Sequence, residues 1–138
     1  MTPVASADHH NNQYLCGHWV QGLIKNRYDQ VPGILQCPTT DELTNPGNSG
    51  KRQHFGTRGN IYWRNYEQEA YSIWGMIWEF WAGAGYEQGK YQYPDSNEGC
   101  CTDFGIPGAA FRYQWFDSGC WALLWDPTQG YRNPFYCH

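Results

Sequence analysis

The sequence predicts an α+β fold: two tandem helix–loop–β-hairpin repeats that pack pseudo-symmetrically and are stabilised by disulfides. Three observations predict it. The chain repeats itself, each repeat joins a helical pattern to paired strand patterns, and the 138 residues include 6 cysteines. We expect a single domain over residues 1–138, with repeat 1 at about 17–66, repeat 2 at about 70–126, and a flexible tail at 1–13.

The internal repetition is visible in three pairs of segments. In order along the chain, residues 20–28 correspond to 73–81, residues 35–42 to 91–98, and residues 54–63 to 115–125. A repeat of this length is one supersecondary unit, which buries its apolar face against a neighbouring copy. Duplicated units present equivalent loops along one surface, whereas catalysis requires a single asymmetric site. The repetition therefore favours a binding function.

The elements of repeat 1 follow from local patterns. Residues 17–28 predict a helix, because their apolar side chains recur at helical spacing. Residues 45–50 are rich in Asn, Gly and Pro and predict a loop. Residues 51–64 predict a β-hairpin with its turn at 56–59, because strong β formers follow that turn.

The elements of repeat 2 come in the same order. A helix is predicted at about 70–82, where glycines follow and end it. Residues 99–108 predict a loop tethered by disulfides. Strands at 110–116 and 120–125 repeat the hairpin. We expect the tail, residues 126–138, to be irregular.

The two helices differ on one face. The positions expected in the core keep their character, with Val20, Leu23, Ile24 and Tyr28 answered by Ile73, Met76, Ile77 and Trp81. Beside them, Gln21 and Lys25 of a solvated stripe become Trp74 and Trp78. Because these positions are four residues apart, the two indoles are expected on one helix face. Either another element covers this indole pair, or the pair is a docking surface.

Composition excludes some functions. Aromatic residues make up 18% of the chain and charged residues 16%, and the net charge is −4 without a basic run. Nucleic-acid binding requires clustered Lys and Arg, so we expect no nucleic-acid partner. No apolar stretch approaches the length of a membrane span, so no membrane insertion is expected. Abundant Trp and Tyr fill cores and also form flat platforms for sugar rings.

The cysteines predict disulfides in an exported protein. They occur at Cys16, Cys37, Cys100, Cys101, Cys120 and Cys137, and none has the Cys-x-x-Cys spacing of a zinc site. An even number in a chain of this size favours three disulfides and a secreted protein. Cys16 is expected to pair with Cys37, and the adjacent pair with Cys120 and Cys137.

Over residues 17–63 the chain resembles the LGFP repeat family. The residues that carry the resemblance are His18, Val20, Gly22, Ile24, Tyr28, Pro38, Thr39, Asp41, Glu42, Phe55, Gly59, Ile61, Tyr62 and Trp63. The second copy is more divergent, with Tyr71 in place of the histidine. Where the family name has glycine, this chain has Gln36 and Gln92. If that glycine requires a positive φ, the local turn must differ here.

The resemblance implies a role at the cell wall. Members of the family are cell-wall-anchoring modules of exported actinobacterial proteins, so cell-wall polysaccharide is the ligand class it implies. A secreted location, associated with the cell wall, is implied in the same way. Two copies held by disulfides suggest a stand-alone relative rather than a fused anchor.

Three sets of residues have side chains that could support catalysis or metal binding. Asp41 and Glu42, with Glu98, have the residue types of a glycosidase pair, or else are repeated turn and capping residues. His18 and His54 are either a metal pair or packed rings with a bonded nitrogen. A Cys–His nucleophile is disfavoured because the cysteines are expected to be oxidised.

Tyr62 and Trp63 are the expected sugar platform. On consecutive strand positions their rings point to opposite faces, so one is expected in the core and the other in solvent. An exposed ring beside Asp41 or Glu42 would stack on a sugar while the carboxylate accepts hydroxyl hydrogen bonds. In the alternative, both rings pack inside.

We therefore expect a binding module without catalytic activity, cofactor or metal. The expected ligand-binding residues are Tyr62, Trp63, Asp41, Glu42, Trp74 and Trp78. The expected partner is a cell-wall glycan. The alternatives are a secreted protein-binding effector or enzyme inhibitor, and a small glycan hydrolase.

Overall fold

The structure, a computed structural model, describes residues 11–100, 112–117, 119–127, 130–131 and 134–136. The chain divides into two compact units, Met1–Trp74 and Gly75–His138. Each unit combines a helix with an antiparallel sheet, which confirms the predicted α+β class.

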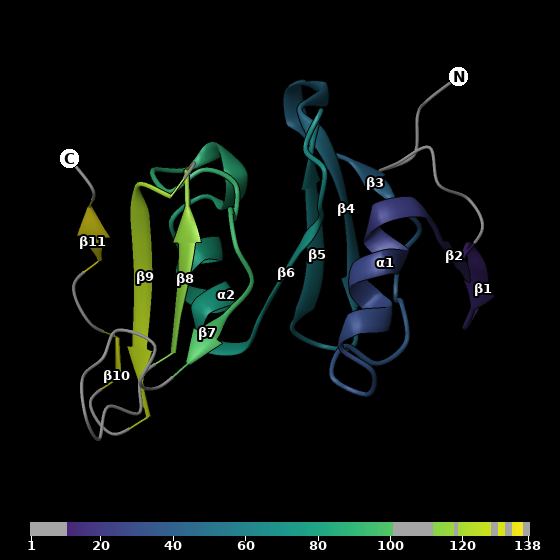
Figure 1. Cartoon of the computed structure of the whole chain (residues 1–138), viewed down its shortest axis with the longest axis horizontal. Helices are drawn as coiled ribbons and strands as arrows, with labels where there is room; N and C mark the ends of the chain where they lie inside the picture. Colours follow the sequence, from purple (N-terminus) through teal and green to yellow (C-terminus); the bar gives the residue numbers. More distant parts are fainter. Residues whose placement is uncertain (1–10, 101–111, 118, 128–129, 132–133, 137–138) are drawn as a thin grey trace. The chain divides into compact units, whose positions relative to one another are not determined.

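The first unit consists of a hairpin, a helix and a sheet. Its elements are β1 (Gln13–Leu15), β2 (His18–Val20), α1 (Gly22–Gln30), β3 (Leu43–Thr44), η1 (Pro46–Asn48), β4 (Gly50–Phe55), β5 (Gly59–Arg64) and β6 (Tyr71–Trp74). Strands β3, β4, β5 and β6 form one antiparallel sheet in that order, and β1 pairs with β2 in a separate hairpin. Helix α1 packs against β5 and β6 (Figure 1).

The second unit also combines one α-helix with an antiparallel sheet, and it has five strands within its described residues. Its elements are α2 (Gly75–Gly83), η2 (Tyr86–Gln88), β7 (Gly99–Cys100), β8 (Arg112–Phe116), β9 (Trp121–Asp126), β10 (Gly130–Tyr131) and β11 (Phe135–Tyr136). The sheet order is β10-β9-β8-β7, and β11 also pairs with β9. Helix α2 packs against β9.

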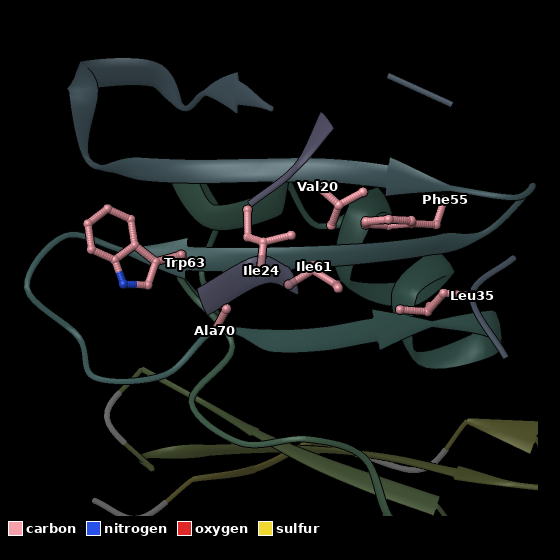
Figure 2. Close-up of a cluster of buried hydrophobic side chains, with 7 residues drawn as sticks. All are labelled: Val20, Ile24, Leu35, Phe55, Ile61, Trp63 and Ala70. Atoms are coloured by element: carbon pink, nitrogen blue, oxygen red, sulfur yellow. The ribbon is translucent and has the colours of Figure 1, made fainter. Parts of the chain in front are cut away.

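The core of the first unit lies between α1 and the sheet. Its buried members are Val20, Ile24, Leu35, Phe55, Ile61, Trp63 and Ala70. Figure 2 shows them in a row, with Trp63 at one end and Leu35 at the other. Ile61 and Trp63 come from alternate positions of β5, which is what a strand with one face on a helix requires. The apolar positions predicted for the first helix therefore do supply this core.

Both predicted hairpins are present. Strands β4 and β5 pair from Phe55–Gly59 at the turn to Gly50–Arg64 at the open end, and β8 pairs with β9 in the same sense. The prediction that residues 126–138 are irregular was wrong in part, because two segments of this tail, β10 and β11, extend the sheet. The predicted loop at 99–108 begins as strand β7, and its residues from 101 onward lie outside the described part of the chain.

The predicted helix starts were wrong by about one turn. Residues 18–20 and 71–74 are strands, and each helix begins at a glycine, Gly22 or Gly75. These glycines have φ values of 55° and 60°, a left-handed conformation that turns the chain from strand into helix. Val20 faces the core from a strand, so its spacing from Ile24 imitates a helical repeat.

The expectation of a different turn at Gln36 and Gln92 was also wrong. Both glutamines adopt the left-handed conformation themselves, with φ values of 66° and 56°. A side chain in this region costs about 1 kcal/mol or more relative to glycine. Glutamine therefore occupies a backbone conformation that favours glycine, at a cost in strain.

The half-buried His54 of β4 predicts a pH dependence of stability. Burial lowers the pKa of His54 from its ordinary 6.5, and the charge of Arg52 lowers it further, while the hydrogen bond to Asn60 opposes both. The unfolded chain then binds the proton more tightly than the folded one. Stability present above about pH 6.5 is lost as pH falls from that unfolded value toward the lower folded pKa. Urea unfolding at several pH values should show a smaller acid loss in His54→Gln than in the wild type; equal losses would contradict this origin.

Candidate functional site

The β1–β2 hairpin is built on a tight two-residue turn. Cys16 and Gly17 both have positive φ, 52° and 88°, as a type I′ turn requires. This turn sets Leu15 opposite His18 and Tyr14 opposite Trp19. Since strand side chains alternate between faces, Tyr14 and Trp19 share one face of the hairpin.

That face carries an exposed aromatic pair. Tyr14 is 59% exposed and Trp19 50%. Their ring centroids lie 5.4 Å apart with the planes at 63°, an edge-on contact. Leu15 and Val20 on the opposite face pack into the core of the unit. The hairpin thus has a buried side and an outer side, and the outer side presents two aromatic rings to solvent. We call this pair the aromatic face.

Several bonds hold the aromatic face in position. The Cys16–Cys37 disulfide joins the hairpin turn to the segment before Pro38. The buried side chain of Gln53 donates from Nε2 to the backbone oxygen of Trp19 at 3.0 Å and to that of Thr40 at 2.8 Å. These anchors fix the strand that carries Trp19 and so hold the aromatic face in one position.

A histidine–aspartate pair adds a further anchor. His18 Nδ1 donates to Asp41 Oδ1 at 2.7 Å, which ties the hairpin to the acidic loop. The Asp41 side chain is 80% exposed. His18 precedes Trp19 in β2 and points to the opposite face of the hairpin, so this bond ties Asp41 to the side of the hairpin away from the aromatic face. His54 is bonded separately, to Asn60.

The predicted platform does not reach solvent. Tyr62 is 2% exposed and Trp63 is 9%, so the expectation that one of them faces solvent was wrong. Trp63 lies in the core, where its indole N–H donates to the backbone oxygen of Glu67 at 2.9 Å. Both faces of β5 are covered at these positions, which is the alternative that the sequence had left open.

The predicted indole stripe is also corrected. Trp74 ends strand β6 in the first unit, and Trp78 lies in helix α2 of the second, so the two do not share a helix face. Trp74 is half-buried against the first core, and Trp78 is half-buried with its ring against Tyr86. The counterpart Lys25 is buried rather than solvated, and its ammonium bonds both carboxylate oxygens of Asp29 at 2.7 and 2.8 Å.

The acidic residues are divided between the units. Asp41 and the half-buried Glu42 belong to the first unit, and Glu98 belongs to the second, where Arg112 lies 3.6 Å from it. Asp41 meets His18 and Glu98 meets Arg112, so each acid has a structural partner of its own. Among the described residues, no group of three or more metal-ligating side chains comes together.

The predicted Cys16–Cys37 pairing is confirmed. Cys100 and Cys120 are also disulfide-bonded. Cys101 and Cys137 lie outside the described residues, so the predicted pairing of the adjacent cysteines with Cys120 and Cys137 stays a prediction.

An aromatic contact of the first unit recurs in the second. Tyr28 of α1 stacks on Phe55 at 5.0 Å and donates its hydroxyl to the backbone oxygen of Gln36 at 2.8 Å. Burial and the charge of Asp29 raise the pKa of Tyr28 above 10.0, so the hydroxyl keeps its proton. In the second unit Trp81 of α2 lies 5.9 Å from Phe116 and donates its indole N–H to the backbone oxygen of Gln92 at 2.8 Å.

A buried glutamine also recurs. Gln114 of β8 donates to the backbone oxygen of Ser96 at 2.7 Å, as Gln53 of β4 does to that of Thr40. In each unit the hydroxyl of the same loop residue accepts from the next strand residue, His54 N at 3.3 Å or Trp115 N at 3.1 Å. The acidic loops of both units are therefore fastened to their hairpins in one way, which fits turn residues better than catalytic ones.

The fold and this face define a small disulfide-bonded repeat module. The model of the LGFP repeat matches residues 35–89. The chain thus carries an LGFP repeat, and the family predicted from the sequence is confirmed. The match begins at Leu35, ahead of Pro38, and ends at Gly89, just before the corresponding segment with Tyr91 and Pro94. No curated protein matches the chain.

Sequence reasoning missed Tyr14 and Trp19. It included Trp19 in a helix and Tyr14 in the segment beside the tail. A signal was available, since Gln-Tyr-Leu and His-Trp-Val flank Cys-Gly, a two-residue connection with glycine second.

Neither of the two helices in the described part of the chain has the length and apolar character that crossing a membrane requires.

The disulfide should stabilise the first unit strongly. We expect the double variant Cys16→Ser with Cys37→Ser to lose about 3 kcal/mol of unfolding free energy, because the bond closes a long loop in the unfolded chain. The two cysteines are 21 residues apart. Urea unfolding followed by tryptophan fluorescence measures the loss, and replacing both cysteines avoids a stray thiol. A variant as stable as the wild type would refute the anchoring role.

Proposed function

We propose that this protein is a non-catalytic, secreted binding module whose aromatic face, Tyr14 and Trp19, stacks on sugar rings of a cell-wall polysaccharide. The observation that carries the proposal is the pair itself: two exposed aromatic rings, 5.4 Å apart, on a hairpin anchored by a disulfide and by Gln53. Indole and phenol rings offer apolar faces to the C–H groups of a sugar and need no cofactor. The LGFP repeat supports the wall polymer as the ligand class.

The proposal includes a carboxylate acceptor. Asp41 is exposed and lies next to the hairpin through its bond to His18. A polymer stacked on Trp19 that extends past the edge of the hairpin would present hydroxyl groups to Asp41 on its other side, and a carboxylate accepts hydrogen bonds from them. In this assignment the histidine positions Asp41 and performs no proton transfer.

We further propose that the two units are diverged copies of one repeat. Three pairs of positive-φ positions support this: Gly22 and Gly75, Gln36 and Gln92, and Gly56 and Asp117. The helix aromatic that donates to a glutamine carbonyl also occurs in both units. Such matched backbone and side-chain details are expected of common descent and not of two unrelated α+β units.

The copies differ in what covers their first strand, and this difference explains why one aromatic face arises. The position of Trp19 in β2 corresponds to Ser72 in β6, which is fully buried where β6 pairs with β5. Strand β2 pairs with β1 alone within the described residues, and Trp19 on its outer face is half exposed. In the second unit β9 corresponds to β5. Its edge away from β8 pairs with β10 and β11, whereas the edge of β5 away from β4 pairs with β6. In this proposal both units share one fold, and of the corresponding strands β2 and β6 only β2 carries an exposed aromatic side chain at this position.

Co-sedimentation of the oxidised protein with purified cell-wall polysaccharide tests the proposal. We expect the wild type to be retained, with neutral soluble oligosaccharide competing for it. A wild type that stays in the supernatant with every wall polymer would sink the proposal. Turnover of the polymer, measured as released reducing ends, would contradict the non-catalytic assignment.

A further inference from the structure

The second unit carries a separate aromatic cluster around Trp121. Trp121 begins β9 and lies beside Tyr136 of β11, with ring centroids 4.6 Å apart. Tyr91 meets the same indole edge-on at 5.1 Å. Tyr136 is 47% exposed, whereas Trp121 is half-buried and Tyr91 is buried. The cluster therefore has an inner part, which fixes the indole, and an outer phenol ring that meets solvent.

A lysine is held against this cluster. Lys90 Nζ lies 4.8 Å from the centroid of the Trp121 ring and 5.9 Å from that of Tyr91. The ring face attracts the ammonium and restricts where it lies. Lys25 and Arg112 by contrast pair with carboxylates, those of Asp29 and Glu98. Lys90 instead contacts aromatic rings, and within the described part of the chain its N–H donors are open to a ligand.

The fold does not require this cluster. In the first unit the corresponding strand position is Gly59, opposite Phe55, as Trp121 is opposite Phe116. A side chain at Gly59 would come within 2.7 Å of Leu35 Cδ2. At this corner, the start of the second hairpin strand, the first unit therefore packs Leu35 against Gly59. The second unit builds the same corner from Tyr91 and Trp121 and adds Lys90, which indicates a function beyond packing.

We infer that Lys90, Trp121 and Tyr136 form a second sugar site, which takes a carboxylate-bearing sugar. The exposed ring of Tyr136 stacks on the sugar, and the Lys90 ammonium bonds its carboxylate. Trp121 touches both and positions them. In a chain of net charge −4, an ammonium set among rings is a local attraction for an anion. This inference rests on the proposed glycan binding, and it names an acidic sugar for a different face.

The test uses the indole N–H signals of the oxidised, full-length protein in two-dimensional NMR. The Trp121 signal is assigned with Trp121→Phe and the Trp19 signal with Trp19→Phe. The probes are a galacturonic acid trisaccharide and a neutral N-acetylglucosamine trisaccharide. We expect the acidic probe to shift the Trp121 signal, and raised salt to weaken that shift. Lys90→Gln should weaken the affinity about fivefold, the range of an exposed ion pair. Lys90→Arg should restore it, and Tyr136→Ala should abolish the shift.

The outcomes separate this inference from the proposed function. A Trp121 signal unmoved by the acidic probe, or moved equally in Lys90→Gln, overturns the second site. If the Trp19 signal still responds to the neutral probe, the aromatic face survives that result. A Trp121 response that persists in Trp19→Ala supports an independent second site, and one that disappears there overturns its independence.

Discussion

Replacing Phe55 with alanine is expected to lower the free energy of unfolding by about 3–5 kcal/mol, the range for deleting a large buried aromatic ring. Phe55 is fully buried and stacks on Tyr28 at 5.0 Å. Its backbone also bridges to Pro38, so the ring lies where helix, hairpin and acidic loop converge. The cavity that Phe55→Ala would leave cannot close unless the helix, the hairpin and the acidic loop all move. Since small domains are stable by only about 5–15 kcal/mol, the variant is expected to be close to unfolded at physiological temperature.

Urea unfolding by tryptophan fluorescence and circular dichroism measures this effect. Phe116→Ala is the matched variant in the second unit, because Phe116 is fully buried and bridges to Pro94 in the same way. Tyr66→Ala is the control: this ring is 96% exposed, and its loss should change stability by no more than about 0.5 kcal/mol. A Phe55→Ala protein as stable as Tyr66→Ala would mean that the core is not organised around this ring.

The hairpins were predictable because their signals are local. The turn at 56–58 and the β formers at Ile61, Tyr62 and Trp63 specify β4 and β5 without help from the rest of the chain. The Cys16–Cys37 pairing was predictable as well, as the two cysteines that flank the first helix. The burial of both Tyr62 and Trp63 was not predictable, because alternation says that two rings face opposite sides and does not say what covers each side.

The helix starts were missed for a different reason. A buried strand residue three or four positions before the first apolar residues of a helix imitates helical periodicity, as Val20 does before Leu23 and Ile24. Only the left-handed φ of Gly22 separates strand from helix there, and a glycine by itself does not announce that conformation. This misplacement hid the β1–β2 hairpin and, with it, the exposed face of Trp19.

Gln36 and Gln92 show how tertiary contacts override a local preference. Glutamine disfavours positive φ, yet each backbone oxygen here accepts a bond from an aromatic side chain of the helix, Tyr28 or Trp81. That bond and the neighbouring bridge of Pro38 or Pro94 specify the turn. The cost of about 1 kcal/mol per residue is comparable to the net contribution of one such hydrogen bond, so the bond and the bridge together offset it.

Trp19→Ala is expected to reduce affinity for cell-wall polysaccharide about thirtyfold or more, a loss of about 2 kcal/mol that is typical of a central tryptophan in a binding face. The indole is half exposed and meets Tyr14 edge-on, so its removal takes away the larger ring and loosens the smaller one. The backbone bond from Gln53 to the Trp19 oxygen does not involve the side chain. The fold should therefore survive.

The measurement is binding of purified variants to immobilised wall polysaccharide, with circular dichroism to check that each variant is folded. Trp19→Phe keeps an aromatic ring and should keep part of the affinity, and Tyr14→Ala should lose less than Trp19→Ala. Tyr66→Ala removes a more exposed ring from another part of the first unit, so it should bind as the wild type does. Equal binding by Trp19→Ala and Tyr66→Ala would exclude the aromatic face. A loss of affinity in Tyr66→Ala alone would place the binding site at the turn after β5. Exposure of the ring would then decide binding, and the anchoring by Cys16–Cys37 and Gln53, which distinguishes Trp19, would not.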